Sequence, residues 1–200
     1  MQRVGMYWHM LPEAAQGRKV IWDGIDRQGR RIIDQAFPKE IRKTQNEHEM
    51  KIEFINGSIW QVVGSDNYNS LIGANPVGIV FSEWSVAKPS AWDYMRPILA
   101  ENGGWALFIY TPRGRNHGYD IYKVAKTNPA WFSQLLSVDD TKILHPQMIQ
   151  DERASIMDSS MPDARSCSIN SGGRILVSST VRISENQAGL FLATLYMSWP

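Results

Sequence analysis

Short apolar runs of strand length alternate with segments of helical pattern along the first two thirds of the chain. Arg3 to Met10 is mostly apolar and aromatic and ends close to Pro12. This pattern predicts a buried strand, then a helix that starts near the proline and runs towards Gly24. Residues 27–49 are rich in charge and contain Pro38, which indicates helix pieces and loop on the surface.

A hairpin is predicted next along the chain. Two β-rich runs, Lys51 to Ile55 and Ile59 to Val63, flank the pair Asn56-Gly57. An Asn-Gly pair between two such runs is the strongest short-range signal for a tight turn between antiparallel strands.

The centre of the chain has the pattern of a strand, a helix and a second strand. Val77 to Phe81 and Trp105 to Tyr110 are continuous apolar runs, as in strands that are covered on both faces. Between them, Pro89 to Leu99 places Trp92, Met95 and Leu99 at helical spacing. The sequence therefore predicts two parallel strands joined by a right-handed crossover, and an α/β fold.

Two further elements are expected before the pattern weakens. A helix begins near Asn116 and reaches Lys126, and Trp131 to Val138 has the character of one more strand. Tryptophans within such apolar segments are expected in the core. The ones concerned are Trp8, Trp22, Trp60, Trp92, Trp105 and Trp131.

Composition narrows the class of protein. The 200 residues are 43% hydrophobic, enough for one core and hardly for two full domains. The formal net charge of +1 gives no electrostatic footprint for nucleic acid, so DNA contacts would come from local arginines or from assembly into a ring. The single cysteine, Cys167, excludes an internal disulfide framework and fits a reducing compartment.

Membrane insertion and export are not expected. Met1 to Met10 lacks the charged start and long apolar stretch of a signal peptide. Gly189 to Trp199 is the most apolar stretch, but it is far shorter than the roughly 20 residues that a membrane-spanning helix needs. We therefore expect a protein of the cytoplasm with no membrane association.

Candidate chemistry lies where two of the predicted strands end. The first strand delivers a small polar residue and then a carboxylate, at the end of a sheet where α/β proteins bind ligands. This run consists of Gly78, Ile79, Val80, Phe81, Ser82 and Glu83. A glutamate in that place can orient and deprotonate a water molecule that attacks a γ-phosphate. A carboxylate at a strand end is also common without any catalytic role.

The second strand ends in a cluster of polar groups that should lie beside Glu83. The cluster supplies a hydroxyl, two guanidinium groups and an amide, from Thr111, Pro112, Arg113, Gly114, Arg115, Asn116 and His117. Guanidinium groups match phosphate oxygens, so these arginines could contact a nucleotide or a DNA backbone. The alternative is a solvated basic loop.

Taken together, these segments resemble the large terminase subunit of tailed bacteriophages from about Tyr7 to Met161. That family consists of P-loop ATPases with an additional strand and a catalytic glutamate. The order and spacing of five stretches carry the resemblance: Asn56-Gly57-Ser58 with Gly64-Ser65-Asp66, Leu71-Ile72-Gly73, Gly78 to Glu83, Trp92 to Ala106, and Thr111 to Gly114.

The resemblance implies roles for these positions. The run Gly78 to Ser82 matches the Walker B strand, and Glu83 matches the residue that activates water. At the position of the family's magnesium-binding aspartate this chain has Ser82, which leaves only a hydroxyl for a water-mediated contact. Thr111 to Gly114 resembles the coupling motif, in which Thr111 would read the γ-phosphate.

The phosphate-binding loop of the family is not found in the 200 residues. It needs Gly, four residues, then Gly-Lys-Ser/Thr. Gly17-Arg18-Lys19-Val20 lacks the hydroxyl and the earlier glycine, and lies within the first predicted helix. The scattered histidines, His9, His48, His117 and His145, have no metal-ligand spacing, and no protein metal site is predicted.

The sequence therefore predicts a partial P-loop NTPase fold with a mostly parallel sheet, flanking helices and a hairpin. We expect residues 1–127 to form a partial ATPase domain and 128–163 a connector towards a nuclease domain. Residues 164–200 would form an unplaced tail that a shifted reading frame or an insertion could explain.

The resemblance implies a part of the motor that packages double-stranded DNA with ATP and Mg²⁺, not competent for catalysis alone. Its partners would be DNA, the small terminase subunit, the portal protein and other copies in a ring. Two alternatives stay open: an interaction module that binds packaging proteins without catalysis, and part of a helicase-type ATPase.

Overall fold

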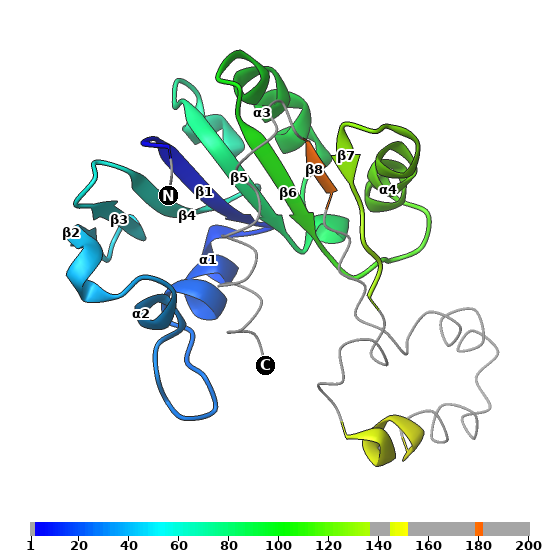
Figure 1. The fold of residues 1–200 in the computed structure, drawn as a ribbon, viewed down its shortest axis with the longest axis horizontal. Coiled ribbons are helices and arrows are strands. Elements are labelled where there is room, and N and C mark those ends of the chain that lie inside the picture. Colours follow the sequence, from blue (N-terminus) through cyan, green and yellow to red (C-terminus); the bar gives the residue numbers. More distant parts are fainter. Residues whose placement is uncertain (1–2, 137–144, 152–178, 182–200) are drawn as a thin grey trace.

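The computed structural model describes residues 3–136, 145–151 and 179–181. Within these residues, an eight-stranded sheet in the order β2-β3-β4-β1-β5-β6-β8-β7 is flanked by helices (Figure 1). The strands are β1 Met6–Leu11, β2 Arg42–Asn46, β3 Lys51–Phe54, β4 Ile59–Gly64, β5 Pro76–Ser82, β6 Trp105–Ile109, β7 Trp131–Phe132 and β8 Ser179–Val181. The α-helices are α1 Ala14–Gly17, α2 Ile32–Ala36, α3 Pro89–Glu101 and α4 His117–Thr127. The short helical turns are η1 Arg18–Trp22, η2 Lys39–Ile41, η3 Tyr68–Leu71 and η4 Trp84–Val86.

The four central strands, β4, β1, β5 and β6, are parallel. The outer strands pair antiparallel on both sides, so the sheet as a whole is mixed. The predicted α/β class and the strand–helix–strand unit β5–α3–β6 are confirmed, and the predicted parallel pairing holds for the centre of the sheet. The parallel strands end at Leu11, Gly64, Ser82 and Ile109. We call this side of the sheet the carboxyl edge.

Two hydrophobic clusters cover the two faces of the central strands. On one face, α3 packs against β1, β5 and β6 through Trp8, Met10, Ile79, Phe81, Ala91, Met95, Leu99 and Phe108. On the other, η1 and α2 pack against β1, β3 and β4 through Tyr7, Leu11, Trp22, Ile33, Phe37, Ile52, Trp60 and Val62. Alternate residues of β1 therefore point to opposite clusters, which is why this strand has no polar face.

The expected core role of the tryptophans is confirmed for the most part. Trp8, Trp22 and Trp60 are almost fully buried, and Trp22 stacks on Trp60 with ring centroids 6.2 Å apart. The other three are partly buried and pack against the clusters; they are Trp92, Trp105 and Trp131.

The hairpin prediction is confirmed. β3 and β4 pair antiparallel with Ile52 opposite Trp60. The turn is closed by Asn56, whose side-chain oxygen accepts a 2.9 Å hydrogen bond from the backbone N–H of Ser58. The asparagine thus fixes the turn by bonding to backbone two residues on.

The expectation for residues 27–49 is wrong in two respects. Ile32 and Ile33 of α2, and Phe37 just after it, are buried and not on the surface. Ile33 and Phe37 belong to the cluster that contains Trp60. In the sequence, the charged residues on both sides obscure this short apolar pattern. The segment also contains β2, an edge strand of the sheet, whose polar sequence gives no alternating signal and whose charges suit an exposed edge.

The helix predicted after Pro12 is confirmed with a change of winding. α1 continues without a break into η1, a π-helical turn, and ends at Trp22. Gly17 lies where the helix approaches β4, and a Cβ atom there would come within 2.5 Å of Val62 Cγ1. The segment Gly17 to Val20 is thus a packing feature of this helix, as expected, and not a loop that holds phosphate.

Of the two later elements, the helix is confirmed and the strand is much shorter than predicted. α4 begins after Asn116, whose side chain caps it by accepting a hydrogen bond from Gly118 N–H. β7 covers Trp131–Phe132. Residues 133–136 of the predicted strand are described and are not part of a strand, and its end at Val138 lies outside the described residues. Much of the expected connector, 128–163, and of the tail, 164–200, also lies outside them, although β8 belongs to the tail. Within the described part of the chain, no helix has the length and apolar character to cross a membrane.

Candidate functional site

Glu83 directly follows β5 and has an unusual backbone. Its φ of 55° and ψ of 39° lie in the left-handed region, which costs a residue with a side chain about 1–2 kcal/mol. Strain of this kind is held in place only by its surroundings and clusters at functional sites. The bend turns the chain away from the sheet into η4, so that the carboxylate-bearing residue lies at the carboxyl edge.

The strand that carries Thr111 is the direct neighbour of the strand that carries Glu83. β5 and β6 pair parallel with Ser82 opposite Ile109, so Glu83 and Thr111 follow adjacent strand ends. Ser85 joins the two segments, because its hydroxyl donates a 2.7 Å hydrogen bond to the carbonyl oxygen of Thr111. The structure thus brings together the two segments that the sequence nominates.

Two further hydrogen bonds fix η4 to the start of α4. The Asn116 side-chain amide donates to the carbonyl oxygen of Ser85 at 2.9 Å, and His117 Nε2 lies 2.6 Å from the carbonyl oxygen of Trp84. Trp84 is 1% exposed, so its buried ring anchors η4 to the core. The two hydrogen bonds anchor η4 to the start of α4. A shift of α4 or of the Thr111 segment would therefore displace η4 and Glu83 with it.

The turn after Thr111 presents free positive charge. Pro112 is half-buried, whereas Arg113, Gly114 and Arg115 are exposed. In the part of the chain that the structure describes, neither arginine has an ion-pair partner. Their guanidinium groups are therefore available to an anion at the carboxyl edge.

The same edge is held together on its other side by Ser65 and Asp66. Ser65, fully buried, donates its hydroxyl to the carbonyl oxygen of Pro12 and accepts from the backbone N–H of Lys88, both at 3.1 Å. Asp66 accepts a hydrogen bond from Ala14 N–H. These contacts join the ends of β1 and β4 to the start of α3. The Gly64-Ser65-Asp66 stretch of the sequence pattern thus has a structural role at this edge.

A buried histidine lies next to Ser82. His9 of β1 is 3% exposed, and its Nε2 is 2.7 Å from Ser82 Oγ. Its other ring nitrogen, Nδ1, is buried and has no hydrogen-bond partner among the described residues. Desolvation by burial lowers the pKa of His9 to about 4, so the ring is neutral at physiological pH.

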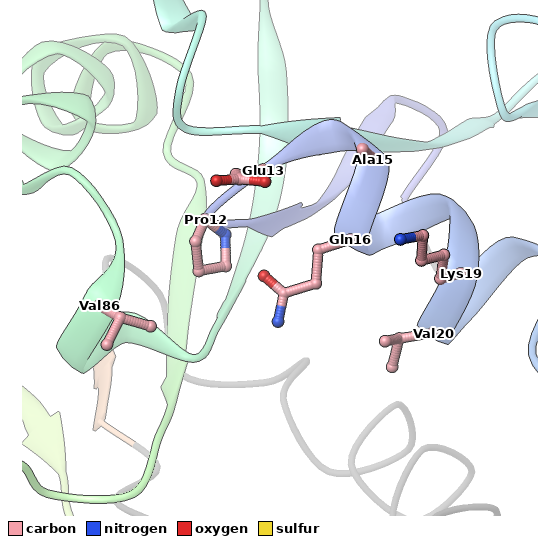
Figure 2. A pocket seen from close by; sticks show the side chains of 7 residues that line it. All are labelled: Pro12, Glu13, Ala15, Gln16, Lys19, Val20 and Val86. Atoms are coloured by element: carbon pink, nitrogen blue, oxygen red, sulfur yellow. The ribbon is translucent and has the colours of Figure 1, made fainter.

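A shallow cavity of about 410 Å³ lies between the start of the first helix and η4. Figure 2 shows Val86 on one side, Gln16, Lys19 and Val20 of the helix on the other, and Pro12 and Glu13 between them. The cavity therefore opens beside the ends of β1 and β5, where α/β sheets bind ligands.

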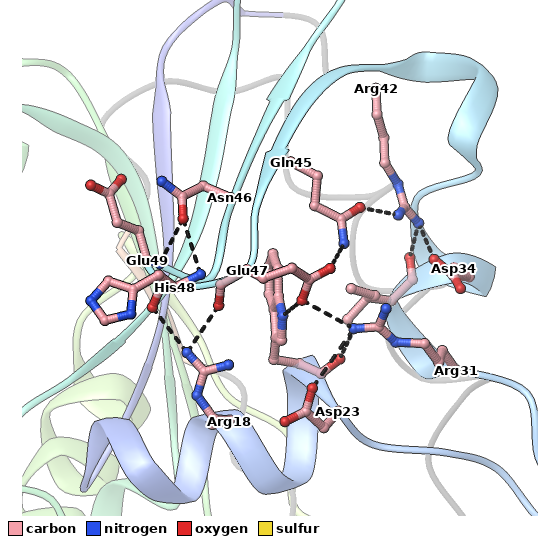
Figure 3. Close-up of polar contacts among 12 residues, drawn as sticks. Arg18, Asp23, Arg31, Asp34, Arg42, Gln45, Asn46, Glu47, His48 and Glu49 are labelled. Carbon is pink, nitrogen blue, oxygen red and sulfur yellow. Dashed lines mark hydrogen bonds and ion pairs between the residues drawn. The ribbon is translucent and has the colours of Figure 1, made fainter.

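A second polar cluster lies away from the carboxyl edge, where the β2–β3 turn meets η1. Figure 3 shows Arg18 donating to the carbonyl oxygens of Glu47 and His48. Trp22 Nε1 also donates to the Glu47 carboxylate. The bond from Trp22 is the main cause of a lowered pKa at Glu47. The polar groups of this cluster bond to one another. They therefore anchor the β2–β3 turn to η1, and few of them are left to bind a ligand.

Comparison with known proteins places this geometry in context. No model of a known protein family matches the chain. The large terminase subunit of Escherichia phage T5 is 30% identical over 94 residues, which are 44% of this chain and 22% of the T5 protein. The chain resembles the phage large terminase subunit, and the match spans less than a quarter of the T5 protein's length.

Solved terminases share the fold. The ATPase domain of the Thermus phage P74-26 large terminase matches with a TM-score of 0.54 and 16% identity, over 85% of this chain and 76% of that one. The large terminase of another thermophilic bacteriophage matches with a TM-score of 0.55 and 13% identity, over 80% of this chain and 39% of that one. The resemblance that the sequence suggests is confirmed, and the fold is that of a terminase ATPase domain.

The site at the carboxyl edge does not offer the ligands of a resident magnesium ion. Mg²⁺ takes oxygen ligands in a near-octahedral arrangement and is usually held by one or two carboxylates. Here Ser82 supplies a hydroxyl that already contacts His9, and Glu83 is the carboxylate beside it. Among the described residues, no group of three His, Cys, Asp or Glu side chains is arranged to hold a metal ion.

Sequence reasoning misses two residues of the carboxyl edge. His9 shares no ligand spacing with the other histidines, so the sequence does not nominate it, yet a lone imidazole in an apolar strand must find a buried polar partner. Ser85 lies just after the predicted strand, where nothing in the local pattern marks a bond to a residue 26 positions away.

Proposed function

We propose that this chain is part of the ATPase domain of a phage terminase large subunit, the ATP-driven motor that packages double-stranded DNA. The observation that carries the proposal is the placement of Glu83 and the Thr111 turn at one edge of a terminase-type sheet. The similarity to the T5 protein supports the assignment.

In this function, Glu83 acts as the base that orients and deprotonates the attacking water. Its left-handed backbone and its anchored neighbour Trp84 fix the position of the Glu83 backbone at the carboxyl edge. Thr111 reads the γ-phosphate, and Pro112 to Gly114 couples hydrolysis to movement. Arg113 contacts a phosphate oxygen of the nucleotide or of the DNA.

The hydrogen bonds around η4 couple the Thr111 segment to Glu83 and α4. Ser85 donates to Thr111 O, and Asn116 donates to Ser85 O, so the two segments move as one. A change at the γ-phosphate that displaces Thr111 is then passed to Glu83 and to α4.

ATP hydrolysis needs phosphate-binding residues that the 200 residues of this chain do not contain. Positioning and electrostatic stabilisation supply most of the catalysis of phosphoryl transfer. We therefore propose that the chain does not hydrolyse ATP by itself. In the full motor it would work in the host cytoplasm with DNA, the small subunit, the portal and further copies in a ring.

Phosphate release from ATP, measured with Mg²⁺ and linear double-stranded DNA, tests this function. The chain alone should release no more phosphate than its Glu83→Gln variant. Joined at its N-terminus to a strand, a Gly-x₄-Gly-Lys-Ser/Thr loop and a helix, it should gain DNA-stimulated turnover. That turnover should fall on the order of a hundredfold in Glu83→Gln, and equal turnover in both forms would contradict the role of Glu83.

The assay also separates the alternatives. An interaction module would give no turnover in the joined form, while a tag on the chain would still retain a packaging protein from infected cells. A helicase-type ATPase would turn over equally on single-stranded DNA, whereas a packaging motor requires the duplex. The terminase neighbours in fold favour the packaging motor.

A further inference from the structure

The pair formed by His9 and Ser82 determines what the carboxyl edge can bind. The two residues lie on adjacent strands, and their side chains share the face of the sheet that α1 and η1 cover. Ser82 is half-buried and is the last residue of β5. It directly precedes Glu83 at the carboxyl edge.

The hydrogen bond between the two side chains can be made in two ways. Either the imidazole Nε2–H donates to Ser82 Oγ, or Ser82 O–H donates to an unprotonated Nε2. A neutral imidazole carries one N–H, so the second arrangement would place the hydrogen on Nδ1. That nitrogen is buried without a partner in the described part of the chain.

Burial decides between the two arrangements. An N–H group without an acceptor in the interior is rarer and costlier than an acceptor without a donor. The arrangement with Nε2–H leaves only a lone pair without a partner, at Nδ1. His9 therefore donates to Ser82 Oγ.

Because His9 donates to Ser82, the hydrogen of the Ser82 hydroxyl is not used in the bond between them. One of the two lone pairs of its oxygen accepts from His9, and no second partner of Ser82 Oγ occurs among the described residues. The hydroxyl hydrogen is thus left for an acceptor outside the sheet. A hydroxyl with a hydrogen to donate and one lone pair already used favours an oxyanion over a cation.

We propose that His9 is a positioning residue that commits Ser82 to hydrogen-bond donation, so that this strand end contacts a phosphate oxygen directly and does not hold Mg²⁺. The contact with phosphate rests on the proposed function. The direction of the His9–Ser82 bond and the lack of a metal site do not, because both belong to the chain without nucleotide.

The ¹⁵N chemical shifts of the His9 ring in the full chain test the bond without any substitution. At pH 7.5, the Nε2–H tautomer is expected, and its Nε2–H signal should move in Ser82→Ala while the tautomer stays the same. The Nδ1–H tautomer would overturn the proposal, because Ser82 would then donate to His9 and turn its lone pairs outward.

Mn²⁺ is the probe for the second half of the proposal. Titration of the ¹⁵N-labelled chain with Mn²⁺ should leave the amide signals of residues 81–84 unbroadened at concentrations that broaden them in Ser82→Asp. At least tenfold tighter binding is expected for Ser82→Asp. Broadening of these signals in the unmodified chain that Ser82→Ala abolishes would overturn the proposal.

The two proposals can fail separately. A chain with the expected tautomer and no Mn²⁺ site, but without turnover in the joined form, would leave the role of His9 intact and refute the ATPase assignment. Turnover that depends on Glu83, together with Mn²⁺ binding at Ser82, would refute the role of His9 and support the ATPase assignment.

Discussion

Ser85 Oγ lies 2.7 Å from the carbonyl oxygen of Thr111, across 26 positions of sequence. This bond links the segment after β5 to the segment after β6, and Ser85 is itself 5% exposed. The relationship matters because Glu83 and Thr111 carry the proposed chemistry. One buried hydroxyl thus fixes the spacing between the two parts of the site.

Replacing Ser85 with alanine should therefore destabilise the chain. The carbonyl of Thr111 would lose its buried donor, which costs about 1–2 kcal/mol in the free energy of unfolding. Urea denaturation measures this loss. Ser70→Ala is the control, because Ser70 makes a similar 2.8 Å bond to Asn67 O in an exposed setting and should change stability by less than about 0.5 kcal/mol.

Two buried serines give a second contrast. Ser65 and Ser58 are both fully buried, but Ser65 makes two hydrogen bonds through its hydroxyl and Ser58 Oγ makes none among the described residues. Ser65→Ala should lower the free energy of unfolding by about 2 kcal/mol, whereas Ser58→Ala should be neutral or stabilising. If both variants lost the same stability in urea, the account of the carboxyl edge around Ser65 would be wrong.

The left-handed backbone of Glu83 predicts a stability gain from glycine. Glu83→Gly should be about 1 kcal/mol more stable than Glu83→Ala, because glycine reaches positive φ without steric cost. Thermal or urea unfolding of the two variants measures the difference. Alanine as stable as glycine at this position would show that the backbone is unstrained.

Burial of His9 makes stability depend on pH. Its pKa of about 4 in the folded chain lies below the 6.5 of a free histidine, so between these values the unfolded chain binds a proton that the folded chain does not. As the pH falls from 6.5 towards 4, His9 should lower the free energy of unfolding by up to about 1.4 kcal/mol per pH unit.

The comparison with His9→Gln isolates this effect. Urea unfolding at pH 7.5, 6.0 and 5.0 should show a shallower loss of stability in His9→Gln than in the unmodified chain. An identical pH dependence in the His9 variant would contradict the burial of a neutral ring.

The features that the sequence predicts well are those with a local signal. The runs of β5 and β6, the helical spacing of Met95 and Leu99 and the Asn-Gly turn each identify an element from neighbouring residues. The adjacency of Glu83 and Thr111 follows from them, because consecutive parallel strands joined by a helix end at the same edge.

What the sequence could not predict depends on contacts between distant residues. β2 is a strand because β3 offers it a hydrogen-bonding edge, and its own residues are polar. The pairing of His9 with Ser82 spans 73 positions. The left-handed turn at Glu83 reflects the anchoring of Trp84, which no propensity of glutamate would indicate.

The central claim is that the segments around Glu83 and Thr111 face a nucleotide together. A titration with ATP of the ¹⁵N-labelled chain, joined to the strand, phosphate-binding loop and helix used in the ATPase test, tests it most directly, with the amides of β2 as an internal reference. We expect the largest chemical-shift changes in residues 82–86 and 111–116, moving with one common dissociation constant. Changes confined to other segments, or none at millimolar ATP, would contradict the account.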